Sequence, residues 1–335
     1  RGAGVGAPVS APASAGPRAP VGDAPVVAAR GLGVRFGRAA ALDGVSFEVR
    51  PGELFGVIGP DGAGKTTLFR VLVSLLVPDT GESRVLGLDP VGDLWALRAR
   101  VGYMPGRFSL YPDLTVEENL RFFAAVFGTT PERGGALIAP VYGQIAAFRD
   151  RRAGALSGGM KQKLALSCAL VHRPEVLFLD EPTTGVDAVS RREFWDLLGE
   201  LRGAGLTTMV STPYMDEAAR CDRVALMQGG RLLEVDTPAA VAAGYPLPLI
   251  AVRVADPRAR VRLLATLRAY PHAHRVVPFG ATVHYTDARP GGDAAAIADA
   301  LAAHLRAAGF AGATAAPTPA SVEDRFMALM GPEGA

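Results

Sequence analysis

The sequence predicts an α/β domain with a mostly parallel sheet, followed by a small C-terminal α+β domain. Buried strand-like runs alternate with helical segments from about residue 26 to residue 240, a pattern typical of parallel sheets with helices on both faces. After about residue 245, short strands surround two helical segments. Residues 1–25 are rich in alanine, proline and glycine, and they have the composition of a flexible, disordered tail.

Hydrophobic periodicity defines the elements of the first domain. Residues 45–49 (VSFEV) alternate between apolar and polar side chains, as in a strand with one buried face. Residues 53–59 (ELFGVIG) form an apolar run that leads into a glycine-rich turn and a helix beginning near Lys65. Two more buried strands each follow a predicted helix: 176–180 (VLFLD) follows the helix 159–171, and 207–212 (TTMVST) follows the helix 190–203.

The C-terminal domain begins after a boundary marked by Pro246, Pro248 and nearby glycines. Ser321 and Asp324 stand at the spacing of a capping box, which predicts a helix at the end of this domain. The other expected elements are a strand at 250–254, a helix at 257–269, a hairpin formed by 274–279 and 281–287, and a helix at 293–308. We therefore expect a tail at 1–25, a first domain at 26–240 and a second domain at 246–331.

Composition excludes several classes of protein. The formal charge of the 335-residue chain is only +2 and the basic residues are dispersed, so we expect no nucleic-acid partner. Cys168 and Cys221 form neither a disulfide framework nor a metal-binding spacing, and they fit a reducing cytosol. The longest apolar runs fall far short of the roughly 18 residues that a membrane span needs. Any membrane role is expected to depend on another chain.

The loop GPDGAGKTT at residues 59–67 has the pattern of a phosphate-binding loop. In such loops backbone N–H groups converge on phosphate oxygens at a helix N-terminus. Lys65 is expected to contact the β and γ phosphates, and Thr66 to offer its hydroxyl to Mg²⁺. The alternative is a glycine turn that only joins strand to helix. The candidate nucleotide-binding residues of the loop are Gly59, Asp61, Gly62, Ala63, Gly64, Lys65, Thr66 and Thr67.

Two carboxylates follow the buried strand 176–180, at the sheet edge where open α/β sheets bind their ligands. Asp180 is the candidate metal ligand, binding Mg²⁺ directly or through water, together with Thr66. Glu181 is the candidate catalytic residue, because it could polarise a water aimed at the γ-phosphate. The alternative is a solvated turn with helix-capping acids.

A second candidate anion site, LSGGMKQKL at residues 156–164, places Ser157, Gly158 and Gly159 just before a predicted helix. A chain needs only one phosphate loop per nucleotide. The phosphate loop, LSGGM and LFLDEP, in this order and spacing over residues 26–240, resemble the ATP-binding subunit of ABC transporters. The resemblance implies a P-loop ATPase domain with a helical subdomain. It also implies that Ser157, Gly158 and Gly159 close over the ATP held by a second ATPase domain, in a homodimer or a heterodimer.

The resemblance carries further roles onto matching positions. Phe36 matches the aromatic residue that stacks on adenine, although a core aromatic is the alternative. Asp187 matches the loop through which the two ATPase domains communicate. Residues 103–123 match the segment that receives a coupling helix from a polytopic membrane permease. Phe108, Leu110 and Tyr111 could line that groove or belong to the core of the helical subdomain.

The amino-acid sequences of the segment 103–123, of SGGMKQKL and of SVEDRFMAL are most similar to those of bacterial ABC-2-type exporters, including multidrug exporters. This similarity implies a cytoplasmic subunit placed peripherally on the inner membrane. It also implies Mg²⁺-dependent ATP hydrolysis coupled to export. The C-terminal domain is expected to regulate the ATPase or to join its dimer, and His272, His274, His284 and His304 in it are expected to be surface or core residues.

The sequence departs from the family at two positions. The family usually has a glutamine after YMP, which contacts Mg²⁺ and the attacking water. It usually has a histidine before YMDEA, which contacts the γ-phosphate. Here these positions are Gly106 and Pro213, and neither can donate a side-chain hydrogen bond. We therefore expect ATP binding to survive and hydrolysis to be slow. The alternative is a nucleotide-binding subunit in which ATP-driven dimerisation matters and hydrolysis is negligible.

Overall fold

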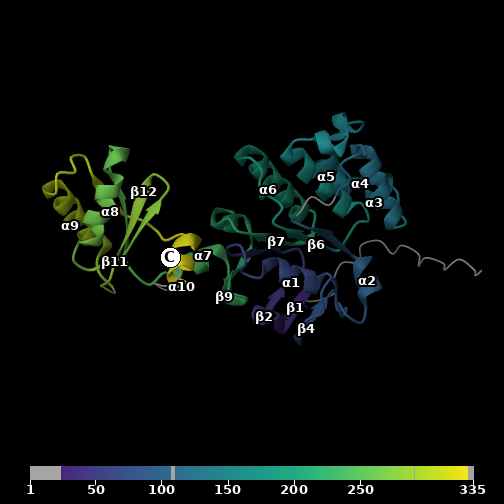
Figure 1. The fold of residues 1–335 in the computed structure, drawn as a ribbon, viewed down its shortest axis with the longest axis horizontal. Helices are drawn as coiled ribbons and strands as arrows, with labels where there is room; N and C mark the ends of the chain where they lie inside the picture. Colours follow the sequence, from purple (N-terminus) through teal and green to yellow (C-terminus); the bar gives the residue numbers. More distant parts are fainter. Residues whose placement is uncertain (1–23, 107–109, 290, 331–335) are drawn as a thin grey trace, which may run out of the picture. The chain divides into compact units, whose positions relative to one another are not determined.

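The structure, a computed structural model, describes residues 24–106, 110–289 and 291–330. These residues form two compact units (Figure 1). In its described part the first unit comprises residues 24–55, 64–212 and 229–231, and the second comprises 56–63, 213–228 and the residues from 232 onward. The predicted tail lies almost entirely outside the described residues. The predicted boundary between residues 240 and 246 stays a prediction.

A three-stranded antiparallel sheet belongs to the first unit and has the order β2-β1-β4. Its strands are β1 (Val27–Phe36), β2 (Ala39–Val49) and β4 (Thr80–Val85). The predicted alternation in VSFEV is confirmed, because Val45, Phe47 and Val49 are buried while the residues between them are exposed. Phe47 then stacks on Phe55 with ring centroids 5.5 Å apart, which anchors this sheet to the strand that leads to the phosphate loop.

The main sheet has six strands in the order β5-β6-β7-β3-β8-β9. The pairs β5·β6 and β6·β7 are parallel, as the alternation of strands and helices predicts. All five residues of β6 are buried, including its terminal Asp180. The strands are β3 (Leu54–Ile58), β5 (Val101–Met104), β6 (Val176–Asp180), β7 (Thr207–Thr212), β8 (Arg223–Gln228) and β9 (Arg231–Asp236).

Helices of the first unit position the ends of these strands. Helix α1 (Lys65–Leu72) begins directly after the glycine loop and buries Leu68, Phe69, Val71 and Leu72. Helix α5 (Gly158–Leu170) is buried without interruption from Leu164 to Leu170, as expected of a helix enclosed on all sides. The remaining helices are α2 (Leu94–Arg98), α3 (Val116–Val126), α4 (Pro131–Tyr142) and α6 (Ala188–Gly203), with the short 3₁₀ helices η1 (Ala146–Phe148) and η2 (Ala153–Ala155).

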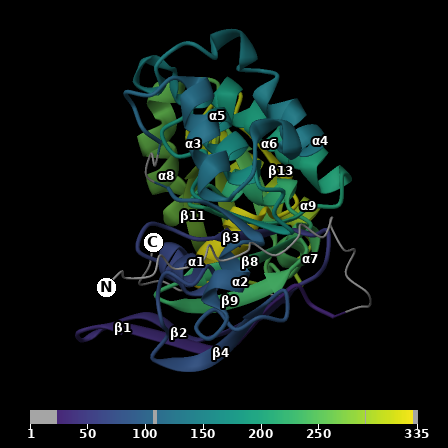
Figure 2. The same cartoon turned by 90° about the vertical axis from the view of Figure 1, so that its right-hand side faces the viewer.

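Helices α3, α4 and α5 gather at one end of the first unit, opposite the antiparallel sheet of β1, β2 and β4 (Figures 1 and 2). A capping box at Thr115 and Glu118 begins α3, since the Thr115 hydroxyl accepts from the Glu118 N–H and the Glu118 carboxylate accepts from the Thr115 N–H. Helix α4 is kinked at Gly135, which adopts a φ of 49°. The first unit thus contains a helical cluster distinct from its sheets.

The C-terminal residues of the second unit form a β-α-β-β-α-β fold. Its four-stranded sheet has the order β11-β12-β10-β13 with antiparallel neighbours, which is the ferredoxin-like arrangement. The predicted hairpin is the pair β11·β12. The elements are β10 (Leu249–Arg253), η4 (Pro257–Ala259), α8 (Arg260–Arg268), β11 (Ala273–Phe279), β12 (Thr282–Asp287), α9 (Ala294–Ala307) and β13 (Thr314–Pro317).

Helix α10 (Val322–Leu329) begins with the predicted capping box, in which Ser321 and Asp324 satisfy each other's N–H groups. Asp324 also contacts Nδ1 of His284 at 2.8 Å, and Arg325 contacts Glu234 at 2.8 Å. His284 is therefore a buried residue with a carboxylate partner forty positions away in the sequence. These contacts attach α10 both to the C-terminal sheet and to β9.

Two short segments precede β8 and β10. After Pro213 and Tyr214 the chain forms the 3₁₀ helix η3 (Met215–Arg220). Short 3₁₀ turns commonly serve as such connectors. Helix α7 (Pro238–Ala243) follows β9 and is capped by the Thr237 hydroxyl, which accepts from the Ala240 N–H.

Candidate nucleotide-binding site

The glycine loop requires backbone positions that other residues cannot occupy. A Cβ at Gly59 would lie 2.1 Å from the Met227 carbonyl oxygen, so only glycine fits there. Gly64 adopts a φ of 107° and stands at the N-cap of α1 without a side-chain cap, a conformation that glycine adopts at little cost. The first N–H groups of α1 are therefore not capped by a side chain, as at helix termini that bind phosphate.

Lys65 is the first residue of α1 and is only 3% exposed. Its Nζ lies 3.0 Å from Oε1 of Glu181, which follows β6. A buried ammonium group needs an anionic partner to offset its desolvation. The structure thus brings together the expected phosphate ligand and the expected catalytic carboxylate, which lie far apart in the sequence.

Asp180 ends β6 and is 2% exposed. Its Oδ1 accepts hydrogen bonds from the Thr66 hydroxyl at 3.1 Å and from the Ser211 hydroxyl at 2.6 Å. Burial raises the pKa of Asp180, and the hydrogen bonds from Ser211 and Thr66 act in the opposite direction. A hydroxyl and a carboxylate oxygen are hard ligands that suit Mg²⁺, which usually takes one or two protein oxygens and completes its shell with waters and substrate phosphates.

Glu181 has an unusual backbone conformation, with a φ of 48°. Its N–H donates to Ser211, with the carbonyl oxygen at 3.1 Å and the hydroxyl at 2.9 Å. Left-handed conformations are uncommon in residues other than glycine, and they persist where the surroundings fix them. Here the end of β7 fixes the direction in which the Glu181 side chain leaves the sheet.

Ser211 is a site residue that sequence reasoning missed. Its hydroxyl donates to Asp180 and accepts from the Glu181 N–H, so one side chain orients both acidic residues. In the parallel ladder β6·β7 Ser211 pairs with Asp180. A polar residue at the end of the strand next to Asp180 was the signal that could have identified it.

The two positions that depart from the family lie in connecting segments after strands. Gly106 follows β5, and a Cβ at this position would lie 3.0 Å from the Asp180 carbonyl oxygen. Any side chain at residue 106 therefore requires a small shift of this part of the chain. Pro213 follows the last residue of β7 directly. Gly106 and Pro213 thus both lie beside strand ends, and neither has a side chain that can donate a hydrogen bond.

The segment around Ser157 forms the start of α5. Ser157 is the N-cap, and its hydroxyl accepts from the Met160 N–H at 3.3 Å. Gly158 and Gly159 lie within the first turn of α5, whereas the sequence placed them just before the helix. The reason is that the Ser157 cap lets the helix begin at the residue that follows it. The N-terminus of α5 thus starts with two residues that lack side chains.

Gly159 lies against the start of α6. A Cβ on it would meet the Ser190 hydroxyl oxygen at 2.5 Å. Asp187 caps α6 by accepting from the N–H groups of Val189 and Ser190, and these bonds, chiefly the one from Ser190, lower its pKa. The structure therefore brings the Ser157 segment and Asp187 together through Ser190.

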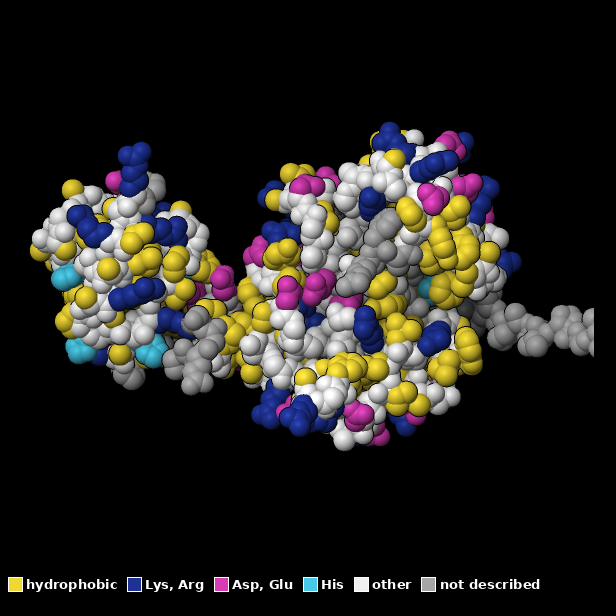
Figure 3. Space-filling view, viewed as in Figure 1, with side chains coloured by type: hydrophobic (Ala, Val, Ile, Leu, Met, Phe, Trp, Pro, Cys, Tyr) yellow, Lys and Arg dark blue, Asp and Glu magenta, His cyan; other side chains and the backbone are white. Residues whose placement is uncertain are grey.

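The remaining candidates lie at the surface. Phe36 ends β1 and is 55% exposed, which leaves its ring accessible to a ligand. Leu110 is buried, whereas Tyr111 is 47% exposed and meets Phe122 edge-on at 4.7 Å. Phe108 lies outside the described residues. Apolar side chains gather on the surface over α3 (Figure 3), and the exposed ones there include Tyr111, Phe122, Val126 and Phe127.

Among residues 24–106, 110–289 and 291–330, no cluster of three or more His, Cys, Asp or Glu is arranged to hold a metal ion. None of the helices in the same residues has the length and apolar character required to cross a bilayer. Beside the glycine loop, Thr66 and Asp180 supply a hydroxyl and a carboxylate oxygen that lie 3.1 Å apart.

Comparisons with known proteins identify the family. The sequence pattern of the family described as ABC transporter matches residues 42–184. The chain is 45% identical over 218 residues to the probable multidrug ABC transporter ATP-binding protein YbhF of Escherichia coli (strain K12), covering 64% of this chain but only 37% of that protein. It is 36% identical over 304 residues to the Nod factor export ATP-binding protein I of Paraburkholderia xenovorans (strain LB400), covering 89% of this chain and 94% of that protein.

Solved structures agree with the sequence relatives. The structure of cbiO1 from Clostridium perfringens, part of the ABC transporter complex cbiONQ, matches with a TM-score of 0.59 and 27% identity over 67% of this chain and 92% of that chain. A second ATP-binding subunit of an ABC transporter matches with a TM-score of 0.59 and 25% identity, covering 65% of this chain and 92% of that chain. The chain therefore belongs to the ATP-binding proteins of ABC transporters, which are P-loop ATPases that bind ATP with Mg²⁺.

Proposed function

We propose that this chain couples the binding and slow hydrolysis of MgATP to export through a separate membrane permease. The observation that supports the proposal best is the cluster at the end of β6, where Lys65 contacts Glu181 at 3.0 Å and Thr66 contacts Asp180 at 3.1 Å. The relatives named for multidrug transport and Nod factor export point to an exporter. The ABC-2-type assignment and the placement on the cytoplasmic face of the inner membrane belong to this proposal.

Each residue of the cluster has a role in binding. The loop N–H groups and the α1 terminus receive phosphate oxygens, and Lys65 neutralises charge on the β and γ phosphates. Thr66 and Asp180 would hold Mg²⁺, which supplies charge neutralisation at the transferring phosphoryl group when bound. Because Lys65 contacts Glu181, a triphosphate at the loop competes with Glu181 for the ammonium group and frees this carboxylate to face a water.

Hydrolysis then forms a bond between the water oxygen and the γ phosphorus and breaks the bond from that phosphorus to the β–γ bridging oxygen. Glu181 orients the water and accepts its proton. The two donors that the family usually adds are absent at Gly106 and Pro213. Loss of one transition-state donor typically lowers kcat by about 10² to 10³, and two losses in one site need not add.

The proposed partners are a polytopic permease and a second ATPase domain. The exposed apolar residues over α3 are our candidate for the surface that receives the permease. Ser157, Gly158 and Gly159 are intact and can complete the site of a second ATPase domain. An asymmetric pair, with a slow site here and a competent site on another chain, is consistent with both features.

The alternative is a nucleotide-binding subunit whose dimerisation matters and whose hydrolysis is negligible, which the two missing donors favour. ATP affinity and turnover, measured on the same purified chain, test the proposal and separate the alternatives. MgATP retained in equilibrium dialysis, loss of retention in Lys65→Ala, and slow turnover that Glu181→Gln abolishes would support a slow coupling ATPase. Retention without turnover, both for the chain alone and after a second ABC ATPase domain is added, would favour the alternative. Turnover of several per second, abolished by Glu181→Gln, would contradict a slow site.

A further inference from the structure

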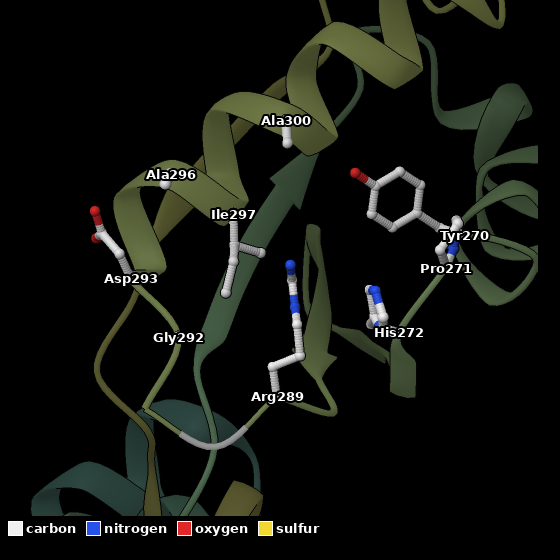
Figure 4. A pocket seen from close by; sticks show the side chains of 9 residues that line it. All are labelled: Tyr270, Pro271, His272, Arg289, Gly292, Asp293, Ala296, Ile297 and Ala300. Carbon is white, nitrogen blue, oxygen red and sulfur yellow. The ribbon is translucent and has the colours of Figure 1, made fainter.

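The C-terminal domain contains a cavity of about 410 Å³ (Figure 4). It lies between the first turns of α9 and the loop that joins α8 to β11, and both of these belong to the second unit. Its volume falls within the range of small-molecule sites, roughly 300 to 1,000 Å³. None of its lining residues belongs to the nucleotide-binding loop or to the cluster at the end of β6.

Arg289 is the charged group that reaches into the cavity. Its Nε donates to Asp287 Oδ1 at 2.7 Å, and its Nη2 donates to Asp287 Oδ2 at 3.0 Å. The Asp287 side chain is 0% exposed, and it also accepts from the Tyr285 hydroxyl at 3.2 Å. The arginine is therefore held in one orientation by a buried carboxylate, which reduces the entropy lost when a ligand binds.

The guanidinium keeps donors for a ligand. The Nε and Nη2 groups of Arg289 both donate to Asp287, and these two bonds use one edge of the guanidinium. The tip of the side chain lies between Ile297 and His272 in Figure 4, and Arg289 is among the residues that line the cavity. Arginine has only donors, so the complementary ligand group is an acceptor, and a planar carboxylate matches its fork.

Two further polar side chains converge on the same space. His272 has a φ of 65°, and its carbonyl oxygen accepts from the Ala288 N–H at 2.7 Å, which fixes the loop beside the end of β12. The Tyr270 ring meets Tyr285 edge-on at 6.1 Å. In Figure 4 its hydroxyl points toward Ala300 on α9. Donors from two segments, the α8–β11 loop with Tyr270 and His272 and the residues after β12 with Arg289, thus surround the cavity.

The α9 wall is apolar and made of small side chains. Ala296 and Ala300 stand one helical turn apart on the same face, and Ile297 lies beside them. Asp293 caps α9 by accepting from the Ala295 N–H at 2.9 Å, and its carboxylate turns away from Arg289 in Figure 4. A carboxylate bound at Arg289 therefore does not face Asp293, and its apolar part can rest on α9.

We propose that this cavity binds a small organic acid, with its carboxylate on Arg289 and its apolar body against Ala296, Ile297 and Ala300. The Arg289–Asp287 pair supplies a fixed donor edge, and the alanines supply the volume. The site is independent of the nucleotide site in sequence and in chemistry. Its test therefore does not depend on ATP hydrolysis.

Methyl NMR of the full chain tests the proposal directly, because the sequence has only five isoleucines and Ile297 is one of them. The δ1 methyl groups are labelled with ¹³C, and the Ile297 signal is assigned with Ile297→Val. The probe is 3-phenylpropionate, whose ring shifts nearby methyl signals. Ligands of this size reach dissociation constants of roughly 1–10 mM. We expect saturable movement of the Ile297 signal, while those of Ile138 and Ile145 in the first unit stay fixed.

Variants and matched probes decide between outcomes. Ala296→Leu and Ala300→Leu fill the cavity without touching the Arg289–Asp287 pair and should weaken binding at least tenfold. Ala303→Leu, at an exposed α9 position outside the cavity, should bind as the unmodified chain does. The uncharged 3-phenylpropanamide should bind at least tenfold more weakly than the acid.

Three results would overturn the assignment. The first is an Ile297 signal that stays fixed throughout the titration. The second is equal binding by the Ala296→Leu and Ala300→Leu variants. The third is inorganic phosphate that moves the signal as strongly as 3-phenylpropionate, which would make the cavity a site for inorganic anions.

Discussion

Ser211→Ala tests whether one hydroxyl orients both acidic residues of the nucleotide site. The substitution removes the 2.6 Å bond to Asp180 and the 2.9 Å bond from the Glu181 N–H. Hydrogen bonds to charged groups contribute about 1.5–3 kcal/mol, and neutral ones about 0.5–1.5 kcal/mol. The Glu181 N–H keeps the Ser211 carbonyl oxygen at 3.1 Å, so most of the loss falls on Asp180. We expect the folded state to lose about 2 kcal/mol.

Ser167→Ala is the matched control. Ser167 is also fully buried, but its hydroxyl donates to the neutral Lys163 carbonyl oxygen within α5. The expected loss is about 1 kcal/mol or less. Urea unfolding followed by tryptophan fluorescence reports on the first unit, because both tryptophans, Trp95 and Trp195, belong to it.

The pH dependence of this loss identifies its cause. Burial raises the pKa of Asp180, so its carboxylate is protonated more readily in the folded protein than in the unfolded chain. The stability of the folded protein therefore falls as the pH rises from the ordinary pKa of Asp180 to the raised one. Removing the Ser211 hydroxyl raises this pKa further. The destabilisation by Ser211→Ala should therefore be smaller at about pH 4, near the ordinary pKa of an aspartate, than at about pH 7.5.

The same variant should require more Mg²⁺ for half-maximal ATP retention, since Asp180 is less well oriented and more readily protonated. A loss equal to that of Ser167→Ala, with no change between the two pH values and no change in Mg²⁺ requirement, would refute the role of Ser211. Ser211→Thr keeps the hydroxyl and should restore most of the Mg²⁺ response.

Three other predictions concern the rest of the site. Lys65→Ala should abolish MgATP retention in equilibrium dialysis while the far-UV circular dichroism of the chain stays unchanged; undiminished retention would contradict the loop assignment. Pro213→His should raise ATP turnover at least about tenfold. Gly106→Gln should raise it less, because a Cβ at residue 106 lies 3.0 Å from the Asp180 carbonyl oxygen. Steady-state phosphate release measures both rates, and unchanged rates would contradict the idea that missing donors slow the site. Gly159→Ala should lower the free energy of unfolding by about 1–3 kcal/mol through overpacking. Gly199→Ala should leave it equal or raise it, because a Cβ at residue 199 has no neighbouring atom within 4 Å. Urea titrations measure both changes.

Local patterns were sufficient to predict the elements around the glycine loop. The loop, Asp180 and Glu181 each follow a buried apolar run, and strand ends at one sheet edge converge whatever the rest of the chain does. Ser211 was not predicted, because its role depends on the register between β6 and β7. Register between strands thirty residues apart is not visible in either strand alone.

In the C-terminal domain too, contacts between distant segments could not be predicted from the sequence. Its hairpin β11·β12 is formed by adjacent segments and could be read from the sequence. The placement of β10 between β12 and β13 depends on pairing between distant segments. The pairing of His284 with Asp324 depends likewise on α10 reaching the C-terminal sheet. Neither contact leaves a pattern within a short window of the sequence.

We expect the binding and the hydrolysis of ATP to be separable in this chain for a structural reason. The expected binding groups are fixed by regular elements: Lys65 and Thr66 by the first turn of α1, Asp180 by β6. The two missing donors belong to the connecting segments after β5 and β7, whose side chains are not needed to hold Asp180, because Thr66 and Ser211 already do so. Loss of donors in such segments costs transition-state stabilisation and leaves the binding cluster in place. We therefore expect the residues at positions 106 and 213 to slow hydrolysis at this site while the site keeps its capacity to bind MgATP.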